Sequence, residues 1–190
     1  MQTTLDNPQG WSLGLKIGPR PKLRVIEKLG ATAVITLQRP EEGAMGIGEA
    51  CKNLGIKWWG FPLDSRDTTL NSPQAGEQEM GKVVEVTKRV EVLIAEGEQV
   101  FVHCAAGIHR TGMVTFTWLL RRGLDYKGAV TMLGYLRPPT LSDSTLPSKL
   151  RIMHKYLENN NLGEGMKGIQ FLNRSLNTSD LLRNIKMDTP

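Results

Sequence analysis

The sequence predicts an α/β protein built on a central, twisted, mainly parallel sheet that is flanked by helices. Short apolar segments rich in β-branched residues alternate along the chain with segments of helical periodicity. This alternation is typical of strands joined by crossover helices, which place the strands parallel in one sheet. The length of 190 residues is about that of one domain, and it suffices to bury a core without disulfides or a structural metal.

Three segments are predicted to be strands of this sheet. Each is short, apolar and rich in β-branched or aromatic residues, as buried strands are. In chain order they are Ala31–Leu37, Ile56–Leu63 and Gln99–His103. The second strand is expected to stop near Pro62, and Cys51, on the helix before it, is expected to pack in the core. Trp58 and Trp59 are expected to belong to the core as well, not to a substrate platform.

Six segments are predicted to be helices, and the first four end at or just before a glycine, a common helix stop. They are residues 21–30, 44–54, 83–97, 113–122, 126–136 and 147–159. In residues 83–97 the apolar side chains recur at helical spacing, although so many valines also suit a strand. Residues 64–76 are rich in Asp, Ser, Thr, Asn and Pro, and this composition predicts a loop.

Composition excludes several classes of protein. The two cysteines, Cys51 and Cys104, are too few for a disulfide scaffold or a four-cysteine zinc site. No apolar run approaches the ~18 residues of a membrane span. The polar first eight residues lack the basic and apolar regions of a signal peptide. We therefore expect a cytoplasmic protein in which a lone cysteine stays a thiol.

The charge balance is moderately basic, with 24 Lys and Arg against 19 Asp and Glu and a net charge of +5. A solvated surface, a polyanionic partner and a pocket for a phosphorylated substrate are each compatible with this excess. Charge alone therefore does not decide the function.

The segment from Val100 to Met113 carries the chemistry. A buried strand leads into a loop that starts at Cys104 and contains Gly107, Arg110 follows six residues after the cysteine, and an apolar helix leads out. Such a loop directs successive backbone N–H groups inward and makes an anion cradle. The guanidinium of Arg110 can hold two phosphoryl oxygens at once, and the donors favour the thiolate form of Cys104. A thiolate beside an anion cradle predicts phosphoryl transfer through a cysteinyl-phosphate.

The run from His103 to Gly112 resembles the signature loop of the cysteine-dependent protein tyrosine and dual-specificity phosphatase superfamily. The likeness extends over about residues 10–158: Gly18 to Lys22 resembles the opening of compact dual-specificity members, and Pro62-Leu63-Asp64 resembles the loop that carries their general acid. The resemblance implies the sheet architecture described above and phosphomonoester hydrolysis without a metal or other cofactor.

Residue roles follow from this resemblance. Cys104 matches the nucleophile and Arg110 the residue that binds the phosphoryl group. Thr111 matches the hydroxyl that eases departure of the thiolate, and His103 matches the residue that orders the loop. The backbone that would cradle the phosphate belongs to Ala105, Ala106, Gly107, Ile108, His109 and Arg110.

The general acid has two candidates. Asp64 lies two residues after Pro62, as the resemblance implies for the acid, whereas Asp67 fits the family spacing to Cys104 slightly better. Asp67 could instead cap the next segment or pair with Arg66. We favour Asp64.

Several substrates fit these features. The uncharged Ala105, Ala106 and Ile108 favour phosphotyrosine in proteins, with phosphoserine or phosphothreonine as further substrates. The run His109-Arg110-Thr111-Gly112 also resembles loops of inositol pyrophosphatases, so an inositol phosphate or phosphoinositide phosphatase stays open. An RNA 5′-triphosphatase has only the basic balance in its favour. A phosphate-binding module without catalysis is disfavoured, because both Cys104 and Arg110 are present.

The chain is expected to divide into a phosphatase catalytic domain, residues 1–160, and a C-terminal tail or flap, residues 161–190. The tail shows no motif, and Phe171 and Leu172 could be its apolar contacts over a pocket. We expect a monomer whose partner is a phosphorylated protein or another phosphorylated molecule, with no nucleic-acid partner and no membrane span.

Overall fold

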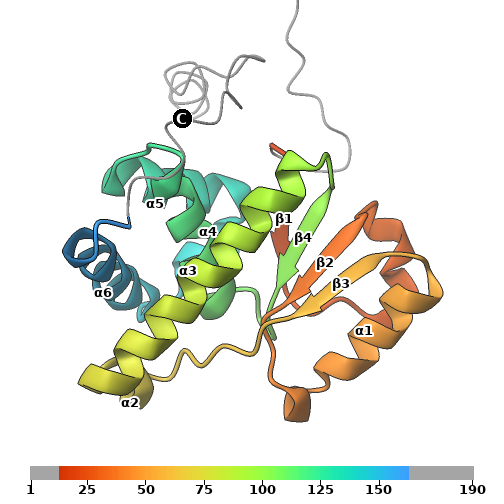
Figure 1. The fold of residues 1–190 in the computed structure, drawn as a ribbon, viewed down its shortest axis with the longest axis horizontal. Helices are drawn as coiled ribbons and strands as arrows, with labels where there is room; N and C mark the ends of the chain where they lie inside the picture. The colour runs from red at the N-terminus through yellow and green to blue at the C-terminus, as the bar shows by residue number, and fades with distance from the viewer. Residues whose placement is uncertain (1–12, 163–190) are drawn as a thin grey trace, which may run out of the picture.

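A computed structural model describes residues 13–162, and its centre is a four-stranded sheet with the order β1-β4-β2-β3 (Figure 1). All three strand pairs are parallel, so the expected α/β architecture with a parallel sheet is confirmed. The strands are β1 (Leu15–Gly18), β2 (Ala33–Thr36), β3 (Lys57–Gly60) and β4 (Val100–His103). β1 was not among the predicted strands.

Helices cover both faces of the sheet: α1 lies on one face, and α3 to α6 lie on the other (Figure 1). The α-helices are α1 (Ala44–Asn53), α2 (Asp67–Leu70), α3 (Pro73–Ala95), α4 (His109–Arg121), α5 (Tyr126–Leu136) and α6 (Leu146–Asn159). Short 3-10 turns are η1 (Leu23–Val25), η2 (Glu27–Leu29), η3 (Pro40–Glu42) and η4 (Pro138–Ser142).

Three expectations about local structure were wrong. The helix expected over residues 113–122 begins four residues earlier, so Arg110 and Thr111 lie in the first turn of α4 and not in the loop. Residues 21–30 form the two 3-10 turns η1 and η2 instead of one helix, and only Ile26 between them is fully buried. One buried side chain gives an α-helix little packing to stabilise it. The segment 64–76 is not a continuous loop, because it contains α2 and the start of α3. Pro73 occupies the first turn of α3, where its missing N–H costs nothing.

The sheet separates two hydrophobic cores. Because side chains alternate along a strand, Val34 and Phe101 face the core beside α1, whereas Ile35 and Val102 face the larger core beneath α3 to α6. Cys51 is packed in the core beside α1, as expected. Trp58 packs against this same core, and Trp59 against the larger one. The central strand β4 therefore ends between two packed layers.

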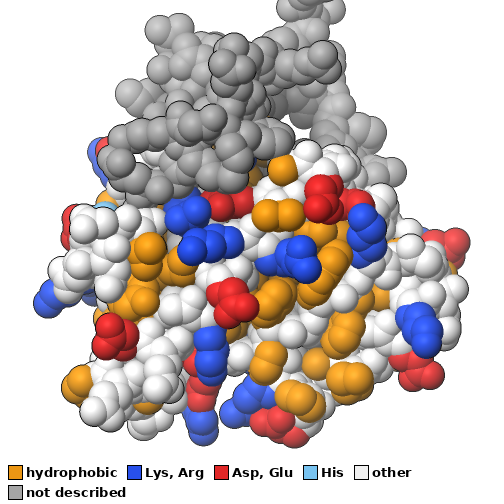
Figure 2. Space-filling model, in the orientation of Figure 1, with side chains coloured by type: hydrophobic (Ala, Val, Ile, Leu, Met, Phe, Trp, Pro, Cys, Tyr) orange, Lys and Arg blue, Asp and Glu red, His pale blue; other side chains and the backbone are white. Residues whose placement is uncertain are grey.

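The surface seen in Figure 2 carries Lys and Arg side chains interspersed with Asp, Glu and apolar side chains. In the part of the chain from residue 13 to residue 162, no helix is both long and apolar enough to cross a membrane. The expected division at residue 160 lies at the edge of the described chain, and residues 163–190, including Phe171 and Leu172, lie outside it.

Candidate active site

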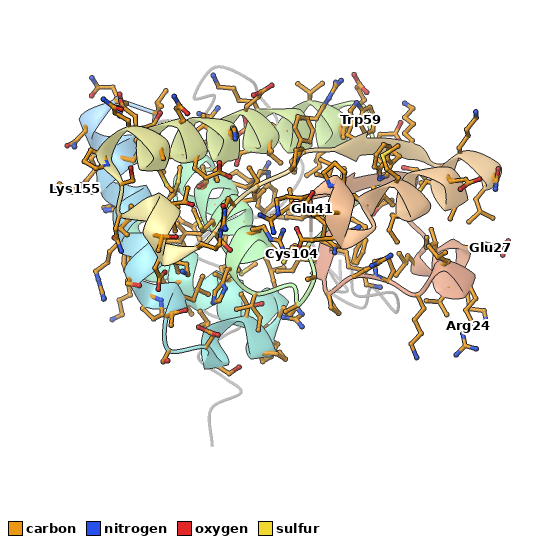
Figure 3. All side chains as sticks on the ribbon, turned by 90° about the horizontal axis from the view of Figure 1, so that it is seen from below. Arg24, Glu27, Glu41, Trp59, Cys104 and Lys155 are labelled. Carbon is orange, nitrogen blue, oxygen red and sulfur yellow. The ribbon has the colours of Figure 1, made fainter. Side chains whose placement is uncertain are left out.

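The candidate site lies where β4 ends and the chain enters α4, at the carboxyl edge of the parallel sheet. Open α/β sheets bind their ligands at this edge. Cys104 follows β4 directly and is 3% exposed. The Gly107 N–H donates to the Cys104 Sγ over 3.2 Å. Figure 3 views the molecule from this side and shows Cys104 near its centre.

The carbonyl groups of the loop are held by groups outside it. The Ala105 carbonyl accepts from the Arg20 backbone N–H at 3.0 Å. The Arg137 guanidinium donates to the Ala106 carbonyl at 3.2 Å and to the Gly107 carbonyl at 2.8 Å. In a trans peptide the N–H points opposite to the carbonyl. The N–H groups of the following residues therefore point into the loop, which makes the anion cradle expected there.

Gly107 is the position in the loop where no other residue fits. Its φ is +68°, and a Cβ there would stand 2.3 Å from the carbonyl carbon and oxygen of Gly18 and 2.6 Å from the Pro19 nitrogen. These are backbone atoms at the end of β1 and of the residue after it, so they cannot rotate away as a side chain could. Packing of β1 beside β4 thus brings a second segment against the cradle.

We expect Gly107→Ala to lower kcat/KM for an aryl phosphate by at least about 10²-fold, because a displacement of roughly 1 Å in a catalytic loop has an effect of that size. Circular dichroism should show that the sheet and helices remain. Gly46→Ala is the control, since a Cβ at Gly46 in α1 meets no atom within 4 Å. Equal activity of the two variants would contradict this role of Gly107.

Arg110 is oriented by a carboxylate that the sequence did not reveal. Its Nη1 and Nη2 donate to the two carboxylate oxygens of Glu42 at 2.6 and 2.7 Å, and Nη1 also donates to the Leu37 carbonyl at 3.3 Å. Hydrogen bonding by Arg110 lowers the pKa of Glu42 from 4.5 to about 2, although burial opposes this shift. The pair therefore persists through mildly acidic pH.

The thiol of Cys104 also influences the pKa of Arg110. Burial acts to lower the pKa of Arg110, but its hydrogen bonds to Glu42 and the proximity of Cys104 outweigh burial and raise this pKa. Arg20 stabilises the arrangement, since its guanidinium donates to the carbonyls of Glu42 and Gly43 at 2.9 and 3.2 Å. Arg20 and Glu42, both far from Arg110 in the sequence, thus hold the Arg110 guanidinium in place near Cys104.

The two candidate acids have different surroundings. The Leu63 carbonyl accepts from the Arg110 Nη1 at 3.5 Å, so Asp64 directly follows a residue that contacts the Arg110 guanidinium. The side chain of Asp67 is 62% exposed and forms an ion pair with Lys149 of α6. The pairing of Asp67 with Arg66 that the sequence suggested is not found: Arg66 pairs with Asp64 instead.

Buried groups fix the segment that carries Asp64. The backbone N–H of Asp64 donates to Glu79 of α3, which is 4% exposed. Lys149, which is 3% exposed, donates to the Ser65 carbonyl at 2.9 Å. Glu79 and Lys149 are charged, yet the helical periodicity places them on the apolar faces of their helices, which pack in the core. A charged residue at such a position is unusual, and this was the signal in the sequence that could have identified them.

Arg66 keeps Asp64 ionised. Both carboxylate oxygens of Asp64 accept from Arg66, and the Thr69 hydroxyl donates at 3.1 Å. Hydrogen bonding by Arg66 holds the pKa of Asp64 far below its ordinary value, in spite of some burial. A general acid must carry its proton when the leaving group departs. The Arg66 contact therefore opposes catalysis by Asp64 in this arrangement.

We expect Arg66→Ala to move the alkaline limb of the kcat/KM profile to higher pH. Loss of the guanidinium raises the pKa of Asp64, so the protonated acid survives to higher pH, and activity there should rise about 10-fold. Arg24→Ala is the control, because Arg24 lies far from Cys104 (Figure 3). An unchanged alkaline limb in the Arg66 variant would show that this contact does not control the acid.

The remaining expected residues occupy the start of α4 and its surroundings. The His109 Nε2 lies 3.0 Å from the Thr145 hydroxyl and 3.0 Å from an Asp143 oxygen, so its side chain pairs with the segment before α6. Thr111 is fully buried, and among the described residues its hydroxyl has no hydrogen-bond partner. The expected role of this hydroxyl toward the Cys104 thiol stays a prediction.

The fold and the site together define a phosphatase-like α/β domain in which a cysteine, a loop with inward N–H groups and an arginine at the start of the next helix lie within one short segment. The family model described as dual specificity phosphatase, catalytic domain, matches residues 19–153. The chain belongs to this family. Among curated proteins, none matches the sequence.

Solved structures of phosphatases share the fold. A mutant form of Tk-PTP superposes with a TM-score of 0.60 at 22% identity, covering 76% of this chain and 89% of that one. Kinase associated phosphatase gives 0.57 at 14% identity, with coverage of 76% and 85%. Human DUSP28 gives 0.55 at 20% identity, with coverage of 79% and 92%. At these identities the likeness concerns the fold, and the substrate class is not resolved.

Proposed function

We propose that this protein hydrolyses phosphomonoesters of proteins, above all phosphotyrosine, through a cysteinyl-phosphate on Cys104 and without a metal. The observation that carries the proposal is the cradle: three consecutive loop carbonyls, those of Ala105, Ala106 and Gly107, are held from outside, so their peptides present N–H groups beside the buried thiol. A cradle of this kind binds a phosphoryl group where the sulfur can reach the phosphorus.

The proposed reaction has two steps. The Cys104 thiolate attacks phosphorus, the P–S bond forms and the ester P–O bond breaks, while Asp64 gives its proton to the departing oxygen. Water then attacks phosphorus, Asp64 takes a proton from the water, and the P–S bond breaks to release phosphate and the thiolate. Arg110 and the loop N–H groups stabilise the negative charge of the transferring phosphoryl group in both steps.

The phosphoprotein substrate is supported by the character of the loop. Ala105 and Ala106 are exposed and uncharged, and Ile108 is half-buried. Two cations of the site are paired with carboxylates, Arg66 with Asp64 and Arg110 with Glu42. The guanidinium groups of Arg20 and Arg137 donate to backbone carbonyls instead. Such a site suits a single phosphoryl group on an otherwise weakly charged carrier.

A substrate panel tests the proposal. We expect turnover of p-nitrophenyl phosphate and a higher kcat/KM on phosphotyrosine peptides than on phosphoserine peptides, inositol polyphosphates or 5′-triphosphorylated RNA. A chelator should leave each rate unchanged. Preference for an inositol polyphosphate or for RNA would replace the proposed substrate class. Phosphate binding without turnover of any member would identify a phosphate-binding module.

A further inference from the structure

A chain of three hydrogen-bonding side chains leads from β3 to the catalytic cysteine. The register of the sheet places Thr36 of β2 directly beside His103 of β4. The Thr36 Oγ1 lies 2.9 Å from the His103 Nε2, and the Trp58 Nε1 of β3 donates to the same oxygen over 2.9 Å. On its other side, the His103 Nδ1 lies 3.3 Å from the Cys104 carbonyl oxygen.

For a neutral imidazole, only one assignment of protons satisfies all three contacts. The indole N–H of Trp58 can only donate and the Cys104 carbonyl can only accept, while a neutral imidazole has one donor and one acceptor nitrogen. The His103 Nδ1 must therefore carry the proton that points to the carbonyl. Its Nε2 must then accept, so the hydroxyl of Thr36 is the donor in that contact, while the same oxygen accepts from Trp58 through a lone pair.

The surroundings of His103 keep the ring neutral and fixed. The side chain is fully buried, and Phe101 stacks on it with 5.6 Å between ring centroids. Burial lowers the pKa of His103 from 6.5 to about 4, and the charges of Arg20 and Arg110 act in the same direction against the opposing effect of the Cys104 carbonyl. The single-donor imidazole on which the assignment rests is thus the form present at neutral pH.

We propose that Trp58 and Thr36 are positioning residues for the nucleophile, because they hold His103 in the Nδ1-protonated form that donates to the Cys104 carbonyl. This inference rests on the proposed function of Cys104. The carbonyl so held belongs to the first peptide of the cradle. If the His103 ring loses its hydrogen bond to Thr36, the ring no longer fixes this peptide. The peptide can then rotate, and the loop N–H groups align less well with the sulfur. The thiolate is then less favoured.

Nuclear magnetic resonance of protein with ¹⁵N-labelled histidine tests the proton assignment without any assay of turnover. The chain has three histidines, and His103→Asn identifies the resonances of His103. We expect a protonated Nδ1 and an unprotonated Nε2 that do not titrate between about pH 5.5 and 8. In Thr36→Val the Nε2 resonance should move toward that of a free imidazole nitrogen, and Thr36→Ser should restore it. A protonated Nε2 in the native protein would overturn the inference.

Alkylation of Cys104 by iodoacetamide tests the consequence for the thiol. At about pH 6, Thr36→Val should be alkylated about 3- to 10-fold more slowly than the native protein, the effect expected from losing one hydrogen bond. Trp58→Phe should show a smaller loss in the same direction. Trp59→Phe is the matched control: this neighbouring indole lies over the Arg89 guanidinium at 4.8 Å and packs against the other core.

The outcomes separate this inference from the proposed function. Native rates of alkylation in both the Thr36→Val and Trp58→Phe variants would overturn the positioning role, whatever the enzyme hydrolyses. The expected resonances and alkylation rates without turnover of any phosphate ester would leave the positioning role in place and reject the proposed function. If Thr36→Val does not fold, the comparison of Trp58→Phe with Trp59→Phe decides the question.

Discussion

Cys104→Ser is expected to abolish turnover, with a loss of at least about 10⁴-fold, while binding of phosphate or vanadate persists. A serine hydroxyl stays protonated at neutral pH unless a base adjoins it, and the nearby His103 directs its Nδ1 proton at the Cys104 carbonyl. The cradle does not depend on sulfur, because Arg20 and Arg137 hold its carbonyls from outside. Single-turnover kinetics with an aryl phosphate and vanadate titration measure the two properties separately.

Cys51→Ala is the matched control for this variant. Cys51 is buried in the core beside α1, and burial raises its pKa to about 11, so it stays an unreactive thiol at neutral pH. The control should therefore retain turnover and the rapid alkylation of the native protein. Turnover by Cys104→Ser within about tenfold of the native rate would reject Cys104 as the nucleophile.

Asp64→Asn is expected to lower kcat for an aryl phosphate by roughly 10²–10⁴-fold and to remove the alkaline limb of its pH profile. The physical reason is that an amide cannot protonate the departing oxygen. The loss should be larger for phenyl phosphate than for p-nitrophenyl phosphate, because the poorer leaving group depends more on the proton. Steady-state rates across the pH range on both esters provide the measurement.

Asp67→Asn is the comparison that decides between the two carboxylates. Its activity should stay near the native level. Its free energy of unfolding should fall by about 1–3 kcal/mol, because the buried Lys149 ammonium loses a hydrogen-bonded ionic partner. If Asp67→Asn shows the catalytic loss and Asp64→Asn does not, the assignment of the acid is wrong. If neither variant shows it, the acid lies elsewhere in the fold.

The elements that the sequence predicted well are those encoded by contiguous residues. Helices α1, α5 and α6 and the strands β2, β3 and β4 match predicted segments to within a few residues, because burial on one face imposes a local period. β1 was missed, since only Leu15 and Ile17 mark it and its pairing with β4 stabilises it. The start of α3 was missed because its first turns are polar and glycine-containing, which resembles a loop.

By itself the sequence determined the fold class and the candidate segment from His103 to Thr111, because the end of a strand, a turn and the start of a helix lie within one short stretch of chain. The tertiary structure decided what surrounds that loop. Glu42 reaches Arg110 across 68 positions of sequence, and Arg137 reaches Ala106 across 31. Such contacts depend on strand order, on register and on helix packing, and a local pattern of residue types contains none of these. The pairing of Thr36 with His103 has the same origin: a shift of one residue between β2 and β4 would turn one side chain to the other face of the sheet.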